Sequence, residues 1–413
     1  MSSAISDNES KTTYIYKQQK LYGRVIDQNF ELFENGKYIL ANDKKSEIID
    51  ILPEGIDLQI MLRILNAKNP IELLPYLKNT IGDFDFSTNA NKTHFDRPIM
   101  SNIALESKFP NVIPCSLDIV PEHLNPNIYA PNGIQKLSLS GYQHKLQVSI
   151  IDNVIKEDYG NFILKPYNDN YSQLPENEHL NVSFMREFNF EVPLNAIVFA
   201  RNNFHYLIKR FDIDENGNKL PQISLNALMK SNDKYKGTIE EISTFLKDKL
   251  DSAQKMQFLK YIYANSLLYN NDLHKKNISF IIKDNKLQIS PVYDIINCYP
   301  IKKLSNDQCT LPIKNHTDGI RINYFKQSSE NIGLDFKEVQ KNLKEMQDIY
   351  LEKYPQYIEK LMKIPNIDNI LNFKEKLLKS HKRCYKIAKS EANNELQNLS
   401  KQKSKEKDSG LSL

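Results

Sequence analysis

The feature that most constrains the fold is a polar loop enclosed between two apolar elements in the last third of the chain. Residues 254–269 carry apolar side chains on one side, a spacing that predicts a helix packed against a core. Residues 278–282 and 287–290 are short apolar runs separated by a Lys-Asp-Asn-Lys turn, which predicts a β-hairpin. The helix and the hairpin would hold the loop at 270–277 on a rigid scaffold, a common setting for functional residues.

This loop and the hairpin carry oxygen ligands suited to phosphoryl transfer. Asp272 and Asn277 lie five residues apart, and Asp294 follows Asn277 by seventeen residues. At about 3.3 Å per residue, the two arms of the hairpin return Asp294 to the neighbourhood of Asn277. Mg²⁺ prefers carboxylate and phosphate oxygens, so the spacing predicts a base for a hydroxyl nucleophile beside a magnesium site. Isolated Asn-Asp pairs also mark ordinary turns, and the apolar elements on both sides favour the catalytic interpretation.

Composition describes a globular chain of ordinary charge. The 413 residues include 55 basic and 51 acidic side chains, and the net charge of +4 does not by itself predict nucleic-acid binding. The four cysteines contain no C-x-x-C pair, so neither a zinc site nor a disulfide framework is indicated, and a reducing cytosol fits best. No apolar run approaches the ~18 residues of a membrane span, and the polar N-terminal stretch lacks a secretory core. We therefore expect a cytoplasmic protein without membrane contact.

Turn residues and apolar periodicity divide the chain into six segments. These are a disordered N-terminus at 1–12, an α+β subdomain at 13–100, a wrapping linker at 101–134, a β-rich lobe at 135–215, a helical lobe at 216–394 and a disordered Lys/Ser-rich tail at 395–413. The predicted fold class is α+β. A β-rich N-lobe followed by a helical C-lobe is the two-lobed plan of protein kinases, here with an extra small N-terminal α+β subdomain.

Two features of the β-rich lobe are suited to binding phosphates. Lys165 ends an apolar strand, where its ammonium group can neutralise nucleotide phosphates, although an ordinary surface lysine gives the same pattern. Ser138, Ser140 and Gly141 precede the strand predicted at 145–151 and can offer hydroxyl and backbone N–H groups. With a single glycine, this segment also fits a simple Ser/Gly turn.

Together these segments resemble HipA-type serine/threonine kinases, the toxins of bacterial toxin–antitoxin modules. Six motifs stand in the order and spacing of that family: Ser-Leu-Ser-Gly-Tyr-Gln-His-Lys at 138–145, Ile-Leu-Lys-Pro at 163–166, Glu-Asn-Glu at 176–178, Lys-Arg-Phe-Asp at 209–212, Asn-Asp-Leu-His-Lys-Lys-Asn at 271–277 and Pro-Val-Tyr-Asp at 291–294. The resemblance covers roughly residues 14–390 and includes 52–55 and 74–85 in the N-terminal subdomain. Six ordered motifs are more specific than any one of them.

The resemblance implies a role for each of these residues. Asp272 would accept or orient the proton of the target hydroxyl, and His274 would orient its neighbours in the catalytic loop. Asn277 and Asp294 would bind Mg²⁺, and Lys165 would hold the phosphates of ATP. The other ATP-binding positions would be Lys209, Arg210 and Phe211 at the adenine hinge, Asp212 near the ribose, and Ser138, Ser140 and Gly141 beside the phosphates.

The resemblance also implies regulation by autophosphorylation. Ser138 matches a serine that becomes phosphorylated in the family, and Ser140 adds a second hydroxyl. A phosphate there would repel the phosphates of ATP. The sequence departs from the family at three places. His144 stands where the family usually has Glu, and Tyr142 stands where it has a small residue. Residues 221–228 keep only part of the acidic helix that follows the hinge in the family. The base and metal positions are all retained, which favours an active kinase.

Three functional hypotheses remain open at this point. The first is a kinase that phosphorylates a translation factor such as an aminoacyl-tRNA synthetase. The second is a catalytically quiet, nucleotide-binding corepressor of a helix-turn-helix antitoxin, through which alone it would contact DNA. The third is an exported kinase that acts on host proteins, with which the high Asn and Lys content is compatible. The basic stretch at 374–389 is a candidate partner surface, but its apolar spacing favours the solvated face of a last amphipathic helix.

Overall fold

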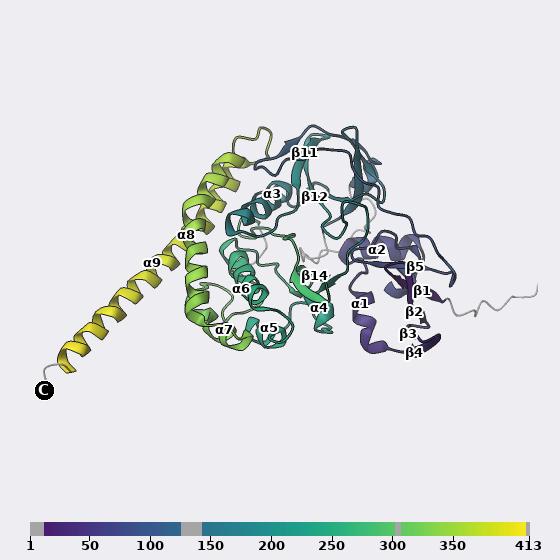
Figure 1. The fold of residues 1–413 in the computed structure, drawn as a ribbon. Helices are drawn as coiled ribbons and strands as arrows, with labels where there is room; N and C mark the ends of the chain where they lie inside the picture. The colour runs from purple at the N-terminus through teal and green to yellow at the C-terminus, as the bar shows by residue number, and fades with distance from the viewer. Residues whose placement is uncertain (1–11, 125–142, 302–306, 410–413) are drawn as a thin grey trace, which may run out of the picture.

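The computed structural model describes residues 12–124, 143–301 and 307–409 (Figure 1). Within these ranges the chain is α+β, as predicted, with a small N-terminal subdomain, a β-rich N-lobe and a helical C-lobe (Figure 1). Three sequence predictions fall wholly or largely outside the described residues: the N-terminus at 1–12, the phosphate-loop residues Ser138, Ser140 and Gly141, and the departure at Tyr142.

The N-terminal subdomain is an antiparallel sheet with short helices packed on it. The strands follow the order β4-β3-β2-β1-β5. Their bounds are β1 Thr13–Lys17, β2 Lys20–Ile26, β3 Asn29–Glu34, β4 Lys37–Leu40 and β5 Phe84–Ser87. The helical elements are η1 Asn42–Lys44, α1 Lys45–Ile49, α2 Gly55–Ile64 and η2 Pro70–Tyr76. Ile15, Phe30, Leu73 and Leu74 are fully buried, so the subdomain has a core of its own.

The N-lobe is built on a seven-stranded sheet in the order β6-β11-β12-β10-β8-β9-β7. The strands are β6 Val112–Ile113, β7 Ser116–Asp118, β8 Leu146–Ile151, β9 Val154–Glu157, β10 Phe162–Lys165, β11 Asn195–Ala200 and β12 Asn203–Lys209. Helix α3 (Leu174–Phe184) packs against β11 and β12 and continues into η5 (Met185–Phe188). Asp152 and Asn153 turn β8 into β9 with positive φ, a backbone conformation that Asn and Asp tolerate.

The edges of this sheet correct the prediction of a wrapping linker at 101–134. Strands β6 and β7 come from that segment and pair in parallel with β11 and β9, and η3 (Pro121–Leu124) follows. The two strands span only two and three residues, so they are too short to carry a recognisable alternation. The described part of the segment, residues 101–124, therefore adds a strand to each edge of the sheet, and residues 125–134 lie outside the described ranges.

The C-lobe is helical apart from a small sheet beside the cleft. Its helices are α4 Leu225–Leu228, α5 Ile239–Leu246, α6 Ser252–Leu267, η6 Lys275–Asn277, η7 Ile322–Phe325, α7 Lys326–Ile332, α8 Phe336–Leu361 and α9 Ile370–Ser409. The sheet contains β13 Gln222–Ser224, β14 Ser279–Lys283 and β15 Lys286–Ile289 in that order. The helix predicted at 254–269 and the hairpin that follows it are confirmed by α6, β14 and β15. None of the helices in the described ranges is long and apolar enough to cross a membrane.

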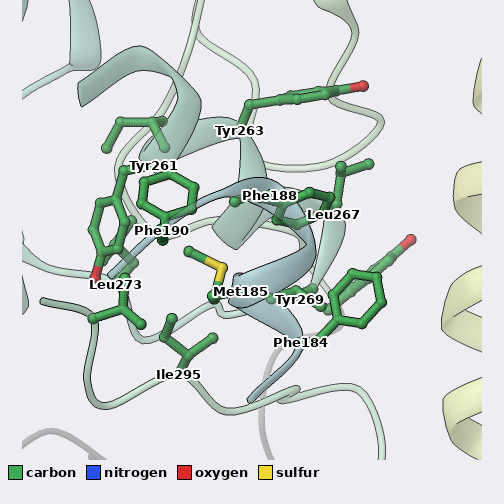
Figure 2. Close-up of a cluster of buried hydrophobic side chains, with 14 of the residues drawn as sticks. Phe184, Met185, Phe188, Phe190, Tyr261, Tyr263, Leu267, Tyr269, Leu273 and Ile295 are labelled. Atoms are coloured by element: carbon green, nitrogen blue, oxygen red, sulfur yellow. The ribbon is translucent and has the colours of Figure 1, made fainter. Parts of the chain in front are cut away.

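The main core joins the two lobes (Figure 2). Phe184, Met185 and Phe188 from the end of α3 and from η5 meet Tyr263 and Leu267 of α6 in a cluster of buried side chains (Figure 2). Burial of large aromatic and aliphatic side chains is the dominant favourable term in folding. The cluster therefore fixes the helix that leads into the predicted catalytic loop.

The last helix corrects the prediction of a disordered tail at 395–413 as far as residue 409, where the described range ends. Helix α9 runs alongside α8 and continues to Ser409, extending beyond the body of the molecule (Figure 1). Residues 395–409 contain neither Gly nor Pro and are rich in Lys, Glu, Gln and Leu, which are good helix formers. Low apolar content indicated disorder, but local helix propensity is a second signal in the same sequence.

Candidate active site

The predicted catalytic loop begins where α6 ends, and Asn270 ties the first turn of this loop to the segment that follows the hairpin. The Asn270 side-chain amide donates to Oδ1 of Asn265 (2.7 Å) and to the carbonyl of Asp294 (3.2 Å). Asn265 lies on the buried face of α6 with 1% of its surface exposed. The helix thus positions Asp294 beside the loop, as the hairpin geometry predicted.

Inside the loop, the predicted base and one predicted metal ligand are held together. The Asn277 side chain donates to the Asp272 carbonyl (3.3 Å), and its backbone N–H donates to the His274 carbonyl (2.9 Å). The Tyr235 hydroxyl lies 3.4 Å from Asp272 Oδ1. Burial, reinforced by the negative charge of Asp294, raises the pKa of Asp272 to about 7. A carboxylate with a pKa near neutrality is well suited to accept a proton.

Asp294 is the most strongly paired carboxylate of the site. Its Oδ1 accepts from Lys165 Nζ, and its Oδ2 accepts from Lys145 Nζ at 3.1 Å. Burial alone would raise the pKa of Asp294, but these two ammonium groups outweigh it and hold that pKa well below its usual range. The residue has a positive φ of 53°, so the backbone turns sharply where the carboxylate enters the site.

Lys165 lies at the centre of this charged group rather than on the surface. Its Nζ is 2.6 Å from Oε1 of Glu178, which comes from α3, and only 4% of the Lys165 side chain is exposed. Burial favours the neutral amine, but the carboxylates of Asp294 and Glu178 outweigh it and raise the pKa of Lys165, which stays protonated. The alternative of an ordinary surface lysine is therefore wrong.

His274 lies in the loop between the base and the metal ligand. Its side chain is buried and lines the cleft, and its ring meets the Tyr235 ring edge-on at 5.1 Å. Burial, together with the charge of Lys234, lowers the pKa of His274 to about 3. Within the described ranges neither ring nitrogen has a hydrogen-bond partner. The imidazole is therefore neutral at physiological pH and is available to hydrogen-bond a ligand in the cleft.

The predicted adenine hinge contains a buried ion pair. Arg210 donates through Nε and Nη2 to the two carboxylate oxygens of Asp212, at 3.0 and 2.6 Å. The same guanidinium donates to the carbonyls of Asn79 and Thr80, and Gly82 N–H donates to Asp212 (2.9 Å). The Asp212 carboxylate is thus engaged with Arg210 and the N-terminal subdomain, so these contacts give no support to its expected role near the ribose.

A cavity of about 740 Å³ lies between the two lobes and the N-terminal subdomain. Four of the predicted site residues line it: Arg210, His274, Asn277 and Asp294. Ile163, Leu146 and Tyr293 add apolar walls from the lobes. Lys165 and Asp272 lie behind this lining, where Lys165 contacts Asp294. Lys209, Phe211 and Asp212 are not part of the lining.

The N-terminal subdomain closes one side of this cavity with acidic residues. Glu54 accepts from Lys276 of the catalytic loop (2.5 Å) and from Lys234 (2.7 Å), and Asp50 lies 3.4 Å from Lys276. Burial opposes ionisation of Glu54, but the two lysines outweigh it and lower its pKa to about 2. The subdomain therefore contacts the catalytic loop directly.

Sequence reasoning did not assign Lys145, Glu178, Tyr235 or Asp57 to the site. Lys145 and Glu178 occur inside the motifs of the family resemblance. Their spacing, Lys145 four residues after Gly141 and Glu178 thirteen residues after Lys165, could have indicated both as site residues. Tyr235 and Asp57 lie in segments with no distinctive pattern. Their proximity to the site arises only from tertiary contacts.

The donor set fits a magnesium ion that shares its ligands with a nucleotide. Asn277 and Asp294 offer one amide oxygen and one carboxylate, and both line the cavity. Within the described ranges no group of three or more His, Cys, Asp or Glu side chains is placed to hold a metal unaided. Mg²⁺ usually takes one or two protein ligands and completes its shell with phosphate oxygens and water.

These features define the class of the protein: a two-lobed, kinase-like fold with a polar catalytic loop and a lysine–carboxylate pair at the cleft. A family model described as "HipA-like C-terminal domain" matches residues 137–353, just over half of the chain. The chain belongs to the HipA-like family, and the resemblance noted in the motifs is confirmed.

Curated relatives carry the name kinase. A Haemophilus influenzae protein named "Putative kinase" is 31% identical over 280 residues, covering 60% of this chain and 81% of that protein. A Sinorhizobium fredii protein named "Putative kinase Y4dM" is 28% identical over 156 residues, covering 34% of this chain and 38% of that protein.

A solved structure supports the fold over nearly the whole chain. It is the toxin–antitoxin complex of HipA and HipB with operator DNA from Shewanella oneidensis. The matched chain has a TM-score of 0.68 at 17% identity, covering 92% of this chain and 98% of that chain. At this level of identity, the likeness establishes the kinase-like fold.

Proposed function

We propose that this protein is an ATP- and Mg²⁺-dependent serine/threonine protein kinase. The observation that carries the proposal is the convergence of four predicted residues: Asp272 and Asn277 share a hydrogen-bonded loop, and Lys165 pairs with Asp294 at the same cleft. Asn270, at the start of the loop that carries Asp272, also donates to the backbone carbonyl of Asp294. This is the set of groups that phosphoryl transfer requires.

In the proposed reaction, each residue has a distinct task. Asp272 accepts the proton of the acceptor hydroxyl as the oxygen of that hydroxyl forms a bond to the γ-phosphorus. The bond between the γ-phosphorus and the bridging oxygen breaks, and ADP leaves with the electron pair. Asn277 and Asp294 would hold Mg²⁺, which would supply positive charge to neutralise the phosphates. Lys165 stays protonated and binds the nucleotide phosphates.

Asp294 would share its carboxylate between Mg²⁺ and two lysines. Each of its oxygens accepts from one ammonium group, those of Lys165 and Lys145. A carboxylate has about four lone-pair sites on its two oxygens, so these two contacts leave capacity for a metal. The two ammonium groups would also lie beside the phosphates of a nucleotide bound through that metal.

Thermal unfolding with ATP tests the nucleotide and metal sites. We expect ATP with Mg²⁺ to raise the melting temperature substantially and ATP with EDTA to raise it only slightly, because bound ligand stabilises the folded state. Asp294→Asn should remove most of the metal-dependent part. Asp284→Asn is the control, because Asp284 lies in the β14–β15 turn with a positive φ that Asn also favours. An equal rise in EDTA would contradict a catalytic metal site.

The family resemblance suggests the substrate and the partner. We propose a translation factor, such as an aminoacyl-tRNA synthetase, as the substrate, with the protein acting in the cytoplasm. A complex with a helix-turn-helix antitoxin is a second proposed activity, favoured by the fold match to a HipA chain solved with HipB and operator DNA. DNA contact would then arise through that partner. An exported kinase that acts on host proteins is the alternative setting for the same chemistry.

Autophosphorylation is proposed at Ser138 or Ser140, which precede Lys145 and strand β8 in the sequence. A phosphate there would add up to about two negative charges beside those of ATP. Peptide mass spectrometry on protein incubated with ATP and Mg²⁺ should find phosphate on this segment, and Asp272→Ala protein should lack it. A kinase that is active on other substrates and carries no phosphate there would refute the switch.

A further inference from the structure

The described part of the N-lobe resumes at Gln143, and the next residue, His144, is held on both ring nitrogens. His144 Nδ1 lies 2.5 Å from Asp57 Oδ1, and His144 Nε2 lies 2.7 Å from the His123 carbonyl oxygen. The two partners are a carboxylate and a carbonyl, and both can only accept hydrogen bonds when Asp57 is ionised. Each ring nitrogen must therefore carry a hydrogen, so these contacts require the imidazolium form of His144.

The same aspartate also holds the backbone of the next residue. Asp57 Oδ2 accepts from the Lys145 N–H at 3.3 Å, and Lys145 Nζ reaches Asp294 Oδ2 at 3.1 Å. A continuous set of contacts thus leads from α2 of the N-terminal subdomain to the proposed metal ligand. Asp57, His144 and Lys145 all line the cavity.

We propose that Asp57 and His144 are positioning residues that direct the Lys145 ammonium group toward the phosphates of a bound nucleoside triphosphate. This rests on the proposed function, because it assigns the residues that shape the phosphate end of the same cleft. The pairing also accounts for a departure in the sequence: a Glu at position 144, usual in the family, would face the Asp57 carboxylate with a like charge. The N-terminal subdomain is thereby part of the nucleotide site.

The surroundings of His144 favour its charged form at neutral pH. Burial opposes the charge, but the hydrogen bond and the charge of Asp57 outweigh it, and the pKa of His144 is raised above its usual 6.5. Among the described residues, the other charged or titratable groups that face it are Glu157 of β9, His123 of η3, which pairs with Glu157 at 2.6 Å, and Lys145. Of these charged groups, Asp57 and Glu157 favour the imidazolium, and the hydrogen bond to the His123 carbonyl favours it as well.

The sign of the pH dependence follows from this raised pKa. The imidazolium makes both contacts, so the arrangement is complete below the folded-state pKa of His144 and is lost as pH rises through it. Neutral imidazole has one N–H and can donate to only one of the two acceptors. Positioning of Lys145 should therefore weaken in mildly alkaline solution.

Equilibrium binding of a non-hydrolysable ATP analogue with Mg²⁺ tests the proposal in the full-length protein. Dissociation constants would be measured at about pH 6 and about pH 8.5 for wild type, Asp57→Asn and His144→Gln. Comparing each variant with wild type at the same pH cancels the titration of the analogue itself. Asp43→Asn is the matched control, because Asp43 makes an exposed ion pair from the same subdomain to Lys230 of the C-lobe.

Near pH 6 we expect Asp57→Asn and His144→Gln to bind about ten-fold more weakly than wild type, the size of one hydrogen bond to a charged group. At the higher pH the difference should shrink, because His144 of the wild type is then neutral as well. Asp43→Asn should match wild type at both pH values. Melting temperatures would identify a variant that fails to fold. In that case the dissociation constants of the other variant test the proposal.

The proposal is overturned if both folded variants bind as tightly as wild type near pH 6, or if their deficit is the same at both pH values. Failure of the wild type to bind the analogue would be a different result. That outcome would contradict the proposed kinase function itself, whereas normal wild-type binding with unaffected variants would contradict only the positioning role.

Discussion

At the scale of single residues, the site depends on buried charges that neutralise one another. Lys165 is held between Glu178 and Asp294, with Glu178 fully buried. Moving charged groups out of water is costly, and the cost is offset only while the partners are present. Loss of the central ammonium group leaves two carboxylates without their shared cation. The same lysine is therefore needed both for phosphate binding and for the stability of the lobe.

Lys165→Met should lower the free energy of unfolding by about 3–5 kcal/mol, the usual cost of breaking a buried ion pair. Lys165→Met combined with Glu178→Gln should recover part of that loss, because one orphaned charge is removed. Lys145→Met is the matched control: Lys145 also pairs with Asp294, but 39% of its side chain is exposed, and we expect a change of about 1 kcal/mol or less. Urea unfolding would measure all three, and an unchanged Lys165→Met protein would contradict the ion-pair account.

Some contacts of the site could be predicted from the sequence and others could not, for a physical reason. Asp272, Asn277 and Asp294 could be predicted because a helix, a loop and a hairpin bring them together within a short stretch of chain. The engagement of Asp212 could not, because its partner Gly82 lies 130 residues away. The contact between Asp57 and His144 spans 87 residues and has no local signature. Local geometry can be read from spacing, but contacts between subdomains cannot.

At the scale of elements, α3 shows that the spacing of apolar residues does not reveal how completely a helix is buried. In the sequence, the apolar residues Leu180, Phe184, Met185 and Phe188 have the spacing of a helix with one buried side, but all residues from Leu174 to Phe184 are buried in the structure. Several polar residues of α3 have specific partners. For example, His179 accepts from Asn111 N–H (2.9 Å), and Asn181 accepts from the Tyr354 hydroxyl (2.8 Å). Buried polar groups of this kind specify one packing arrangement.

Glu176 at the start of α3 gives this element a pH dependence. Burial, with the nearby charge of Asp368, raises the pKa of Glu176 to about 8. The folded state keeps the proton up to that pH, whereas the unfolded chain releases it near 4.5, so the stability of the wild type falls as pH rises from about 4.5 to about 8. Each pKa unit corresponds to about 1.4 kcal/mol.

Glu176→Gln should therefore unfold with a similar free energy to wild type near pH 4.5, and with a free energy higher by a few kcal/mol near pH 8.5. Urea unfolding at the two pH values would measure the difference. A gap between the two proteins that stays constant with pH would show that Glu176 is not a buried, neutral acid in the folded state.

At the scale of the whole molecule, the N-terminal subdomain and the kinase lobes form one unit around the cleft. The connection has a buried part, in which Arg210 donates to the carbonyls of Asn79 and Thr80, and an exposed part, the ion pair between Lys230 and Asp43. Hydrogen bonds from a buried guanidinium contribute more than an exposed ion pair. The buried part should therefore account for most of the attachment.

Arg210→Met should lower the free energy of unfolding by about 3–5 kcal/mol, because it leaves the Asp212 carboxylate buried and without its cation. It should also speed proteolytic release of the N-terminal subdomain. Lys230→Met, which removes an ion pair between the same two units, should change stability by about 1 kcal/mol or less. Equal effects of the two substitutions in urea unfolding would argue against a buried attachment.

The central claim, that this cleft transfers phosphate with Asp272 as base, is tested most directly by transfer of the radiolabelled γ-phosphate of ATP to protein in the presence of Mg²⁺. Wild type and the Asp284→Asn control should incorporate label at similar rates. Asp272→Ala should be slower by about 10²–10⁴-fold, the usual contribution of a positioned base. Its melting temperature should be no lower than that of wild type, because the substitution removes a buried carboxyl whose pKa is raised to about 7. Equal incorporation by Asp272→Ala and wild type would contradict the account.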